Sequence, residues 1–371
     1  MKRLLSVAMS LLMLSLSAAV VHAEEIETSS AAYVLYCPDN GVVLLSCNSD
    51  KELPIASTTK IMTALITLEE AAVDNRVVEF TDDMVAEGSS MYLKRGEKVT
   101  LYDLAVGMMM QSGNDAANAA AIAIAGSMDA FAGRMNDKAR EIGMEHTHFV
   151  TPSGLDDEDH YSAAYDMALL MAYALQNEDF AYITSQTSME VHFVYPADKF
   201  MTYPNHNKLL KMYPDCISGK TGYTDAAGRT LVTAAERGGL TLIAVTLDDP
   251  DDWNDHAALY DYGFEHFERK TLEPDALSIN VVGGSENTVA LTADEMSVVV
   301  PKQTEKIDTQ VSLPAFLYAP VGAGETVGTI TYSVDGEALI DVPLKAVDSV
   351  DYDHKRRNII DYIKDLFNWH S

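Results

Sequence analysis

Cysteine is one of the rarest residues in this sequence. Only 3 cysteines occur in 371 residues, which is too few for a disulfide framework. Cys37 and Cys47 flank "PDNGVVLLS", where Asn40-Gly41 predicts a two-residue hairpin turn. That turn would place Cys37 opposite Leu44 and Cys47 opposite Val34, so the two sulfurs would be offset along the strand pair. We therefore expect three free and largely buried thiols.

Basic residues are also scarce. The chain holds 26 lysines and arginines against 56 acidic residues, and its formal net charge is -30. Nucleic-acid binding requires a basic surface that neutralises phosphates, so this composition argues against DNA or RNA as a partner. A strongly acidic charge favours solubility, but it says little about activity.

The histidines do not have the spacing of a known metal-binding motif. His146, His148 and His160 do not form H-E-x-x-H or another zinc-ligand pattern, which argues against a zinc peptidase. His160 lies in the acidic stretch "LDDEDHY", and we expect it to be a surface histidine. Cys216 has no predicted histidine partner and is expected to be a core cysteine.

Long apolar runs are absent except at the N-terminus. Lys2 and Arg3 precede an almost wholly apolar stretch, residues 4–21, and Val21-His22-Ala23 fits a small-x-small cleavage site. This pattern predicts a secretory signal peptide at residues 1–23 and an exported protein. An uncleaved membrane anchor is the alternative, because the run approaches spanning length.

The remaining chain changes character near residue 269. Residues 24–268 combine strand-like runs such as "AAYVLYC" and "LTLIAVTL" with helical runs such as "IMTALITLEEAA" and "DAANAAAIAIAG". This order predicts a mixed α/β (α+β) domain. Residues 269–350 contain short alternating runs such as "LSINVV", "TVALTA" and "TITYSV" with turn residues between them, which predict a smaller all-β domain.

Residues 351–371 form a third region with an amphipathic pattern. At about 100° per residue, half of a helical wheel would carry the apolar side chains Ile359, Ile360, Tyr362, Ile363, Leu366, Phe367 and Trp369. Lys355, Arg356 and Arg357 precede this pattern. The segment either packs as a helix on its own β domain or lies at a membrane interface, attracted by anionic headgroups. We favour the second interpretation, a C-terminal amphipathic membrane-anchor helix.

Ser57 opens a helical run and is followed by Lys60 three residues later, in "ASTTKIMTALITLE". Residues three apart share one face of a helix, so the lysine amine can reach the serine hydroxyl. A partly desolvated lysine can remove the serine proton, and backbone N–H groups at a helix N-terminus favour developing negative charge. The same spacing also fits a simple capping serine, so it becomes informative only beside further motifs.

Two later motifs supply that context. "MMMQSGNDAANAA" places Ser112-Gly113-Asn114 at a break between two helical runs, and "DCISGKTGYTDAAGRTLV" places Lys220-Thr221-Gly222 just before a strand-like run. Alone, the first fits a capped turn and the second a solvated edge-strand lysine. S-x-x-K, S-x-N and K-T-G in this order are the three motifs of the penicillin-binding and serine β-lactamase superfamily.

Over roughly residues 30–350 the sequence resembles the D-alanyl-D-alanine carboxypeptidases, the low-molecular-mass penicillin-binding proteins of peptidase family S11. The resemblance rests on "PIASTTKIMTALITLE", "GSSMYLKRGEKVTLYDL", "MMMQSGNDAANAAA", "FVTPSGLDDEDHYSAAYDMALL" and "SGKTGYTDAAGRTLV". It implies a β-lactamase/transpeptidase-like catalytic domain at residues 24–268, a β-rich domain at residues 269–350 and an amphipathic anchor at residues 351–371.

The resemblance also implies roles for the motif residues. Ser57 would be the acyl nucleophile and Lys60 its general base, while Ser112 would relay a proton and Asn114 would hold the substrate amide. Ser57 would be acylated with loss of the terminal D-alanine of a peptidoglycan stem peptide, and the ester would then be hydrolysed. β-Lactam antibiotics would acylate the same serine, and no metal or organic cofactor is implied.

The K-T-G strand would bind the terminal carboxylate of the substrate. The resemblance implies that Lys220 and Thr221 contact this carboxylate and that Gly222 allows close approach. The backbone N–H groups of Ser57 and Tyr223 would form the oxyanion hole.

One departure from the family concerns an arginine. Relatives often carry it before the Gly-Phe at the end of the catalytic domain, as a second contact to the carboxylate. Here the stretch "DDPDDWNDHAALYDYGF" contains no arginine. Either Arg229 compensates, or Lys220 and Thr221 hold the carboxylate alone.

Three alternatives share this serine or this fold. A class A β-lactamase would need an E-x-x-x-N loop, and the acids Asp156, Asp157 and Glu158 do not stand four residues before an asparagine. A DD-endopeptidase or transpeptidase would use the same residues, whereas a catalytically idle penicillin-binding protein would be expected to show a broken motif. We therefore expect an exported serine D-Ala-D-Ala carboxypeptidase, peripheral on the outer face of the cytoplasmic membrane.

Overall fold

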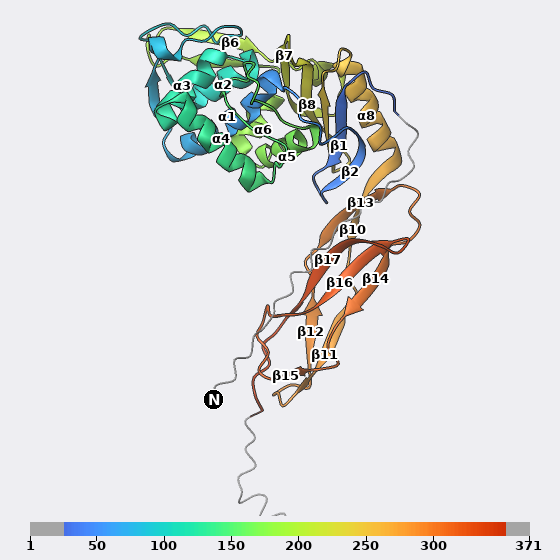
Figure 1. Ribbon diagram of the computed structural model, residues 1–371. Coiled ribbons are helices and arrows are strands. Elements are labelled where there is room, and N and C mark those ends of the chain that lie inside the picture. Colours follow the sequence, from blue (N-terminus) through green and yellow to red (C-terminus); the bar gives the residue numbers. More distant parts are fainter. Residues whose placement is uncertain (1–25, 354–371) are drawn as a thin grey trace, which may run out of the picture.

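The computed structural model describes residues 26–353. The predicted signal peptide and the amphipathic segment from residue 354 onward lie outside the described residues. Figure 1 shows an elongated molecule, with a domain of helices and strands at one end and a β domain at the other. Within residues 26–353, no helix is long and apolar enough to cross a bilayer.

The N-terminal domain is built on a five-stranded antiparallel sheet. Its strand order is β2-β1-β9-β8-β7. The strands are β1 (Ala32–Cys37), β2 (Val42–Cys47), β7 (Cys216–Thr224), β8 (Gly228–Arg237) and β9 (Leu240–Leu247). Every side chain of β1 is buried, because helices cover both faces of the sheet. Since β7 is an edge strand of this sheet, one of its sides has no strand partner among the described residues.

Different helices cover the two faces of this sheet. Helix α8 (Asp252–His266) packs on one face, where Leu259, Tyr260 and Phe264 join buried residues of β1, β8 and β9. On the other face lies a cluster of helices (Figure 1). Its members are η1 (Ala56–Thr59), α1 (Lys60–Val73), α2 (Leu101–Gln111), α3 (Asn114–Ala125), α4 (Met128–Ile142), α5 (Ala164–Ala174) and α6 (Glu178–Ser185).

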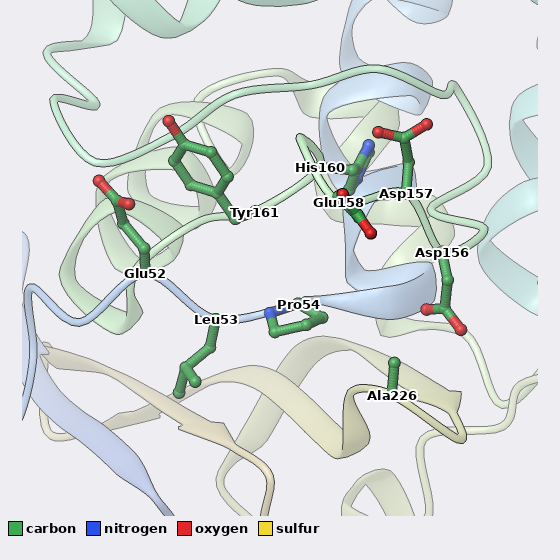
Figure 2. Close-up of a pocket in the computed structure, with 9 residues that line it drawn as sticks. All are labelled: Glu52, Leu53, Pro54, Asp156, Asp157, Glu158, His160, Tyr161 and Ala226. Carbon is green, nitrogen blue, oxygen red and sulfur yellow. The ribbon is translucent and has the colours of Figure 1, made fainter.

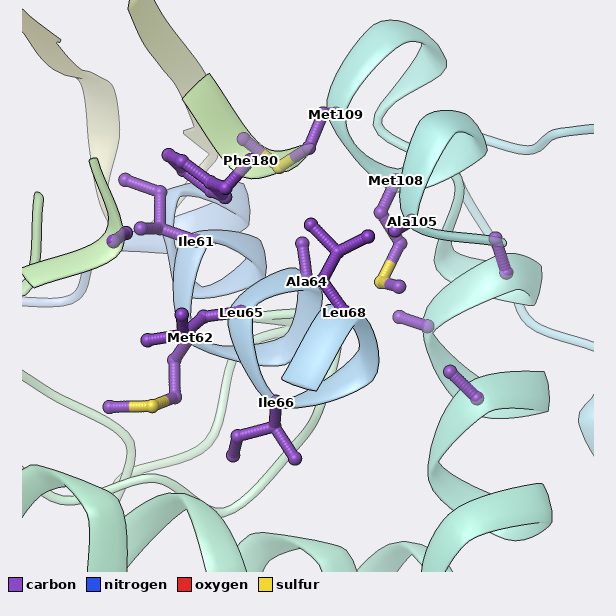
Figure 3. Packing of buried hydrophobic residues seen from close by; sticks show 14 of the residues in the cluster. Ile61, Met62, Ala64, Leu65, Ile66, Leu68, Ala105, Met108, Met109 and Phe180 are labelled. Atoms are coloured by element: carbon purple, nitrogen blue, oxygen red, sulfur yellow. The ribbon is translucent and has the colours of Figure 1, made fainter. Parts of the chain in front are cut away.

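Helix α1 lies at the centre of this cluster. All of its residues from Lys60 to Leu68 are buried, so this part of the helix has no solvent face. Figure 3 shows its apolar side chains surrounded by neighbours that include Met108 and Met109 of α2 and Phe180 of α6. The first turn of α1 is therefore held rigidly, which matters because it carries Lys60.

Smaller elements surround the helices. A short 3-10 helix η2 (Asp82–Met84) and helix α7 (Leu209–Met212) lie in connecting segments. Two hairpin-like pairs complete the domain: β3 (Val77–Glu79) with β4 (Lys98–Thr100), and β5 (Ser188–His192) with β6 (Phe200–Pro204).

The register predicted for the first hairpin is wrong. Cys37 pairs with Val42 and Cys47 with Tyr33, because the loop is longer than two residues and a bulge follows Leu35. The three cysteines are free, as predicted. Cys37 and Cys216 are buried, but Cys47 is exposed, which corrects the expectation of three buried thiols.

The C-terminal domain consists of strands, as the alternating pattern predicts. Its six-stranded sheet has the order β14-β16-β17-β12-β11-β15, and β10 pairs separately with β13. The strands are β10 (Phe267–Leu272), β11 (Leu277–Val282), β12 (Thr288–Thr292), β13 (Met296–Pro301), β14 (Asp308–Ser312), β15 (Leu317–Tyr318), β16 (Thr326–Val334) and β17 (Glu337–Ala346). They enclose an apolar core of their own, which includes Ile279, Val298, Ile330 and Leu344.

Apolar packing and hydrogen bonds connect the two domains. Val299 of β13 packs into the same cluster as Phe264 and Phe267 at the end of α8. Lys302 Nζ donates to the carbonyl of Phe264 at 2.8 Å, and Arg269 Nη1 donates to that of Gly239 at 2.9 Å. The β domain is thus attached beside α8.

Candidate active site

Ser57 lies in a tight turn that leads into helix α1. Thr58 Oγ1 donates to the carbonyl of Ile55 at 2.6 Å, and Thr59 Oγ1 donates to that of Ala56 at 2.8 Å. Ala56 adopts a left-handed conformation with φ 47°, which is unusual for a residue with a Cβ. These two hydroxyls fix the turn and leave Ser57 half-buried at its surface.

Lys60 contacts Ser57 directly. Its Nζ lies 2.8 Å from Ser57 Oγ and donates to the carbonyl of Ser153 at 2.6 Å. The side chain is fully buried. Burial holds the pKa of Lys60 well below that of an ordinary lysine, the positive charge of Lys220 lowers it further, and Asp115 opposes both effects. A neutral amine that can accept the serine proton is therefore accessible.

His160 is buried at 3% exposure, so the prediction of a surface histidine is wrong. Its Nδ1 accepts backbone N–H bonds from Val150 at 3.0 Å and from Thr151 at 3.2 Å. The proton must then lie on Nε2, which donates to Thr59 Oγ1 at 2.8 Å. Burial lowers the pKa of His160 to about 4. A neutral His160 thus supports the turn that carries Ser57, and it does not touch Ser57 itself.

Gly154 brings the loop that ends at His160 against the serine turn. Its φ is 79°, and a Cβ at this position would lie 1.9 Å from the carbonyl oxygen of Ala56. Only glycine allows this approach, which places the neighbouring Ser153 carbonyl against Lys60.

Lys220 and Ser112 meet although they are far apart in the sequence. Lys220 Nζ donates to Ser112 Oγ at 3.0 Å and to the carbonyl of Thr221 at 2.6 Å. Ser112 ends α2 in a left-handed conformation and is buried. Lys220 is also buried, and burial lowers its pKa to about 7.

Asn114 begins helix α3 on the same side of the site. Its Nδ2 donates to the carbonyl of Glu87 at 2.7 Å. Its Oδ1 is buried and accepts no hydrogen bond from the described residues. An unpaired buried acceptor is costly, so this oxygen is a candidate to receive an N–H from a bound molecule.

Asp115 is a buried neighbour of the candidate site that the sequence interpretation missed. Its buried carboxylate accepts from Ser90 Oγ at 2.7 Å and from the backbone N–H groups of Met91 at 2.8 Å and Leu93 at 3.1 Å. It therefore ties the segment that faces Asn114 to the start of α3. The acid in the first turn of a helix was the available signal, but that signal is common.

Gly222 brings strand β7 against the serine turn. A Cβ at this position would lie 2.3 Å from Thr230 Oγ1 and 3.0 Å from the backbone nitrogen of Ser57. The K-T-G residues thus lie inside a strand, whereas the sequence predicted them just before one. Tyr223, the next residue, is 64% exposed on this edge strand.

Arg229 lies near Thr221 but already has a partner. Thr221 pairs with Leu231 and Tyr223 with Arg229, so Thr221 and Arg229 are diagonal neighbours on one face. Arg229 Nη2 contacts both carboxylate oxygens of Asp252, at 2.6 and 2.8 Å. The guanidinium side chain remains 40% exposed, so it can act on a nearby anion from this position.

A hollow of about 510 Å³ borders the serine turn, and Ser57 is not among its lining residues. Figure 2 shows its wall, which is formed by Glu52, Leu53, Pro54, Asp156, Asp157, Glu158, His160, Tyr161 and Ala226. Thr224 Oγ1 donates to Asp156 Oδ1 at 2.6 Å and so connects the hollow to β7. Four carboxylates make this wall more favourable for cations than for anions. Among residues 26–353, no cluster of His, Cys, Asp and Glu could hold a metal ion.

Two family profiles match the chain. One described as D-alanyl-D-alanine carboxypeptidase covers residues 18–251, and one described as penicillin-binding protein 5, C-terminal domain, covers residues 268–352. Among characterised proteins, the D-alanyl-D-alanine carboxypeptidase DacF of Bacillus subtilis is 32% identical, over 98% of this chain and 97% of its own. DacC of Escherichia coli is 34% identical, over 86% and 84%.

Solved structures agree with this match. Penicillin-binding protein 5 of Haemophilus influenzae superposes with a TM-score of 0.78 at 28% identity, covering 89% of this chain and 99% of its own. A mutant of the Streptomyces K15 DD-transpeptidase superposes with a TM-score of 0.61 at 28% identity, over 65% of this chain and all of its own. The predicted fold, a transpeptidase-like mixed α/β domain followed by an all-β domain, is confirmed. The predicted C-terminal helix is outside the described residues.

Proposed function

The chain belongs to the D-alanyl-D-alanine carboxypeptidase family, peptidase family S11, and on this premise we propose that Ser57 attacks the terminal peptide bond of D-Ala-D-Ala. The observation that carries the proposal is the contact of 2.8 Å between Ser57 Oγ and the fully buried amine of Lys60. The amine takes the hydroxyl proton as Oγ attacks the carbonyl carbon. A surface lysine would remain protonated and could not act as this base.

The oxyanion of the tetrahedral intermediate would lie between η1 and β7. The backbone N–H groups of Ser57 and Tyr223 are the proposed donors, and the close approach at Gly222 supports this placement. Collapse of the intermediate breaks the C–N bond and leaves an ester on Ser57. The departing amine takes up a proton and leaves as D-alanine, and water then hydrolyses the ester.

Ser112 and Asn114 would have different roles, the first in proton transfer and the second in holding the substrate. Ser112 Oγ, which contacts Lys220, would pass a proton to the leaving nitrogen. Asn114 Oδ1, buried and unpaired among the described residues, would accept the N–H of the substrate backbone. A substrate amide would thereby satisfy an acceptor that has no partner among residues 26–353.

Lys220 and Thr221 would bind the terminal carboxylate of the substrate. An ammonium and a hydroxyl next to each other on an edge strand suit a carboxylate. Arg229 would add positive charge from its diagonal position, and Asp252 would hold it in place. The charge available from Arg229 is reduced by this ion pair, so we assign the main contact to Lys220 and Thr221.

β-Lactams would acylate the same serine, since their strained amide mimics the bond that is cleaved. The substrates would be peptidoglycan stem peptides, outside the cell. The predicted signal peptide at residues 1–23 and the cationic, amphipathic pattern of residues 355–369 support export and peripheral attachment to the outer face of the cytoplasmic membrane.

The decisive experiment measures D-alanine release from a tripeptide that ends in D-Ala-D-Ala. The mature protein should release D-alanine, whereas Ser57→Ala and Lys60→Ala should not. Ser278→Ala and Lys211→Ala, at exposed positions, are matched controls that should behave like the parent. A fluorescent penicillin should label the parent at Ser57, as located by peptide mass.

Release that persists in Ser57→Ala would overturn the assignment of the nucleophile. Penicillin labelling without D-alanine release would overturn carboxypeptidase activity and favour a penicillin-binding protein without turnover. Rapid hydrolysis of the bound penicillin would favour a β-lactamase instead.

A further inference from the structure

Four exposed apolar side chains gather at the end of the β domain opposite the N-terminal domain. We call Val282, Phe316, Tyr318 and Tyr352 the aromatic tip. Their exposed fractions are 47%, 41%, 71% and 54%. Figure 1 shows β11 and β15, which carry two of them, at the opposite end of the molecule from the helices.

The aromatic tip is formed by three chain segments that are bonded to each other. Val282 pairs with Tyr318 in the parallel contact of β11 with β15, so their side chains are neighbours. The rings of Phe316 and Tyr318 meet edge to face, with centroids 5.1 Å apart. Tyr352 forms a bridge with Gly284, two residues after Val282.

Backbone bonds fix the same region. Asp353 N–H donates to the carbonyl of Gly283 at 3.0 Å, and Ser285 N–H donates to that of Asp351 at 2.8 Å. The rings are therefore presented by a paired scaffold. Exposed apolar groups that gather in this way mark interaction surfaces, and tyrosine in particular is enriched where apolar and aqueous phases meet.

The position of the chain end indicates what the aromatic tip contacts. The described chain ends at Asp353, beside the aromatic tip, and residues 354–371 follow Asp353 in the sequence. Their sequence begins with Lys355, Arg356 and Arg357 and continues with the amphipathic pattern described above. Basic residues followed by an amphipathic stretch with a tryptophan are typical of segments that bind a phospholipid surface.

We propose that the aromatic tip inserts into the headgroup region of a phospholipid membrane, as a second contact beside residues 354–371. Asp351, Asp353 and Glu286 are exposed around the tip, so insertion is shallow and the attraction to anionic lipid comes from the basic residues. Two membrane contacts fix the orientation of the molecule, which a single anchoring segment cannot do. The long axis of the molecule then points away from the membrane and holds the active site at a distance from it.

The test measures how the mature full-length protein partitions onto vesicles of phosphatidylcholine mixed with phosphatidylglycerol. The double variant Phe316→Ser/Tyr318→Ser leaves residues 354–371 intact and should bind about tenfold more weakly. The matched control is Tyr182→Ser/Phe200→Ser, two rings of the N-terminal domain that are 56% and 58% exposed. It should bind like the parent.

Equal partitioning of the tip variant and the parent would overturn the proposal. Tighter binding of the tip variant would also overturn it, and would show that residues 354–371 cover the aromatic tip in the free protein. If vesicle binding weakens as much in the control as in the tip variant, exposed aromatic rings affect binding wherever they lie, which contradicts a specific role for the aromatic tip. D-Alanine release from a soluble tripeptide should be unchanged in both variants, so this readout separates the membrane contact from the proposed catalysis.

Discussion

The two domains differ in how they treat polar side chains. Within residues 26–353, all buried polar or charged side chains lie between Thr58 and His256, in the N-terminal domain. They include Lys60 and Lys220, which contact hydroxyl and carbonyl groups. In the β domain, Lys345 Nζ instead pairs with Asp294 at 2.7 Å on the surface.

This difference separates reactive lysines from structural ones. An amine that is buried without a carboxylate partner has a lowered pKa, and it becomes a base or a tunable charge near neutral pH. An amine on the surface beside a carboxylate stays protonated and contributes little to stability. The large helical core of the N-terminal domain provides the buried environment for both lysines, whereas the core of the β domain consists of apolar and aromatic side chains.

The largest expected effect is on the base. Lys60→Gln keeps a polar side chain of similar length but removes the amine, so kcat/KM for D-alanine release should fall about a hundredfold to ten-thousandfold. Lys345→Gln makes the same exchange in the β domain and should leave kcat/KM unchanged. A Lys60→Gln protein that melts like the parent and retains its activity would break the comparison.

The charge of Lys220 should set the alkaline limit of activity. Burial lowers its pKa to about 7, and carboxylate binding needs the protonated form, so kcat/KM should decline as pH rises through this value. Arginine remains charged over this range, and Lys220→Arg should therefore move the decline to higher pH. Lys211→Arg, at an exposed position, is the control. Identical pH profiles for the parent and Lys220→Arg would contradict the assignment.

His160 should make the stability of the N-terminal domain depend on pH. Burial lowers its pKa from the ordinary histidine value of about 6.5 to about 4 on folding. The contribution of neutral His160 to the free energy of unfolding is thus present above pH 6.5 and is lost as pH falls toward 4. The loss amounts to about 3 kcal/mol.

Denaturant unfolding of the parent and of His160→Gln at several pH values tests this sign. The difference between the two proteins in the free energy of unfolding should shrink as pH falls from 6.5 to 4. The control is His192→Gln, whose side chain is 73% exposed. A difference that does not change with pH would rule out this role for His160.

The smallest effect is expected in the β domain. Lys345→Ala removes an exposed ion pair and should change the free energy of unfolding by less than about 1 kcal/mol. The same measurement on Lys306→Ala, which removes the contact with Asp308, should agree. A large loss in either variant would show that the β domain also depends on its charges.

The sequence by itself determined the features that depend on short spacing. The contact of Lys60 with Ser57 follows from residues three apart at a helix start. The strands of the β domain follow from alternation, and the break at Ser112 follows from turn residues between helical runs. Each of these is a local property, set by backbone geometry within a few residues.

Tertiary structure decided the features that depend on burial and on distant partners. Lys220 meets Ser112 across 108 residues, and Gly222 is needed only because β7 approaches Ser57. An acidic loop suggested a surface position for His160, but the folded chain buries it. The pKa values of both lysines are lowered because surrounding groups exclude water from the amines. Those groups come together only when the helices pack on the sheet.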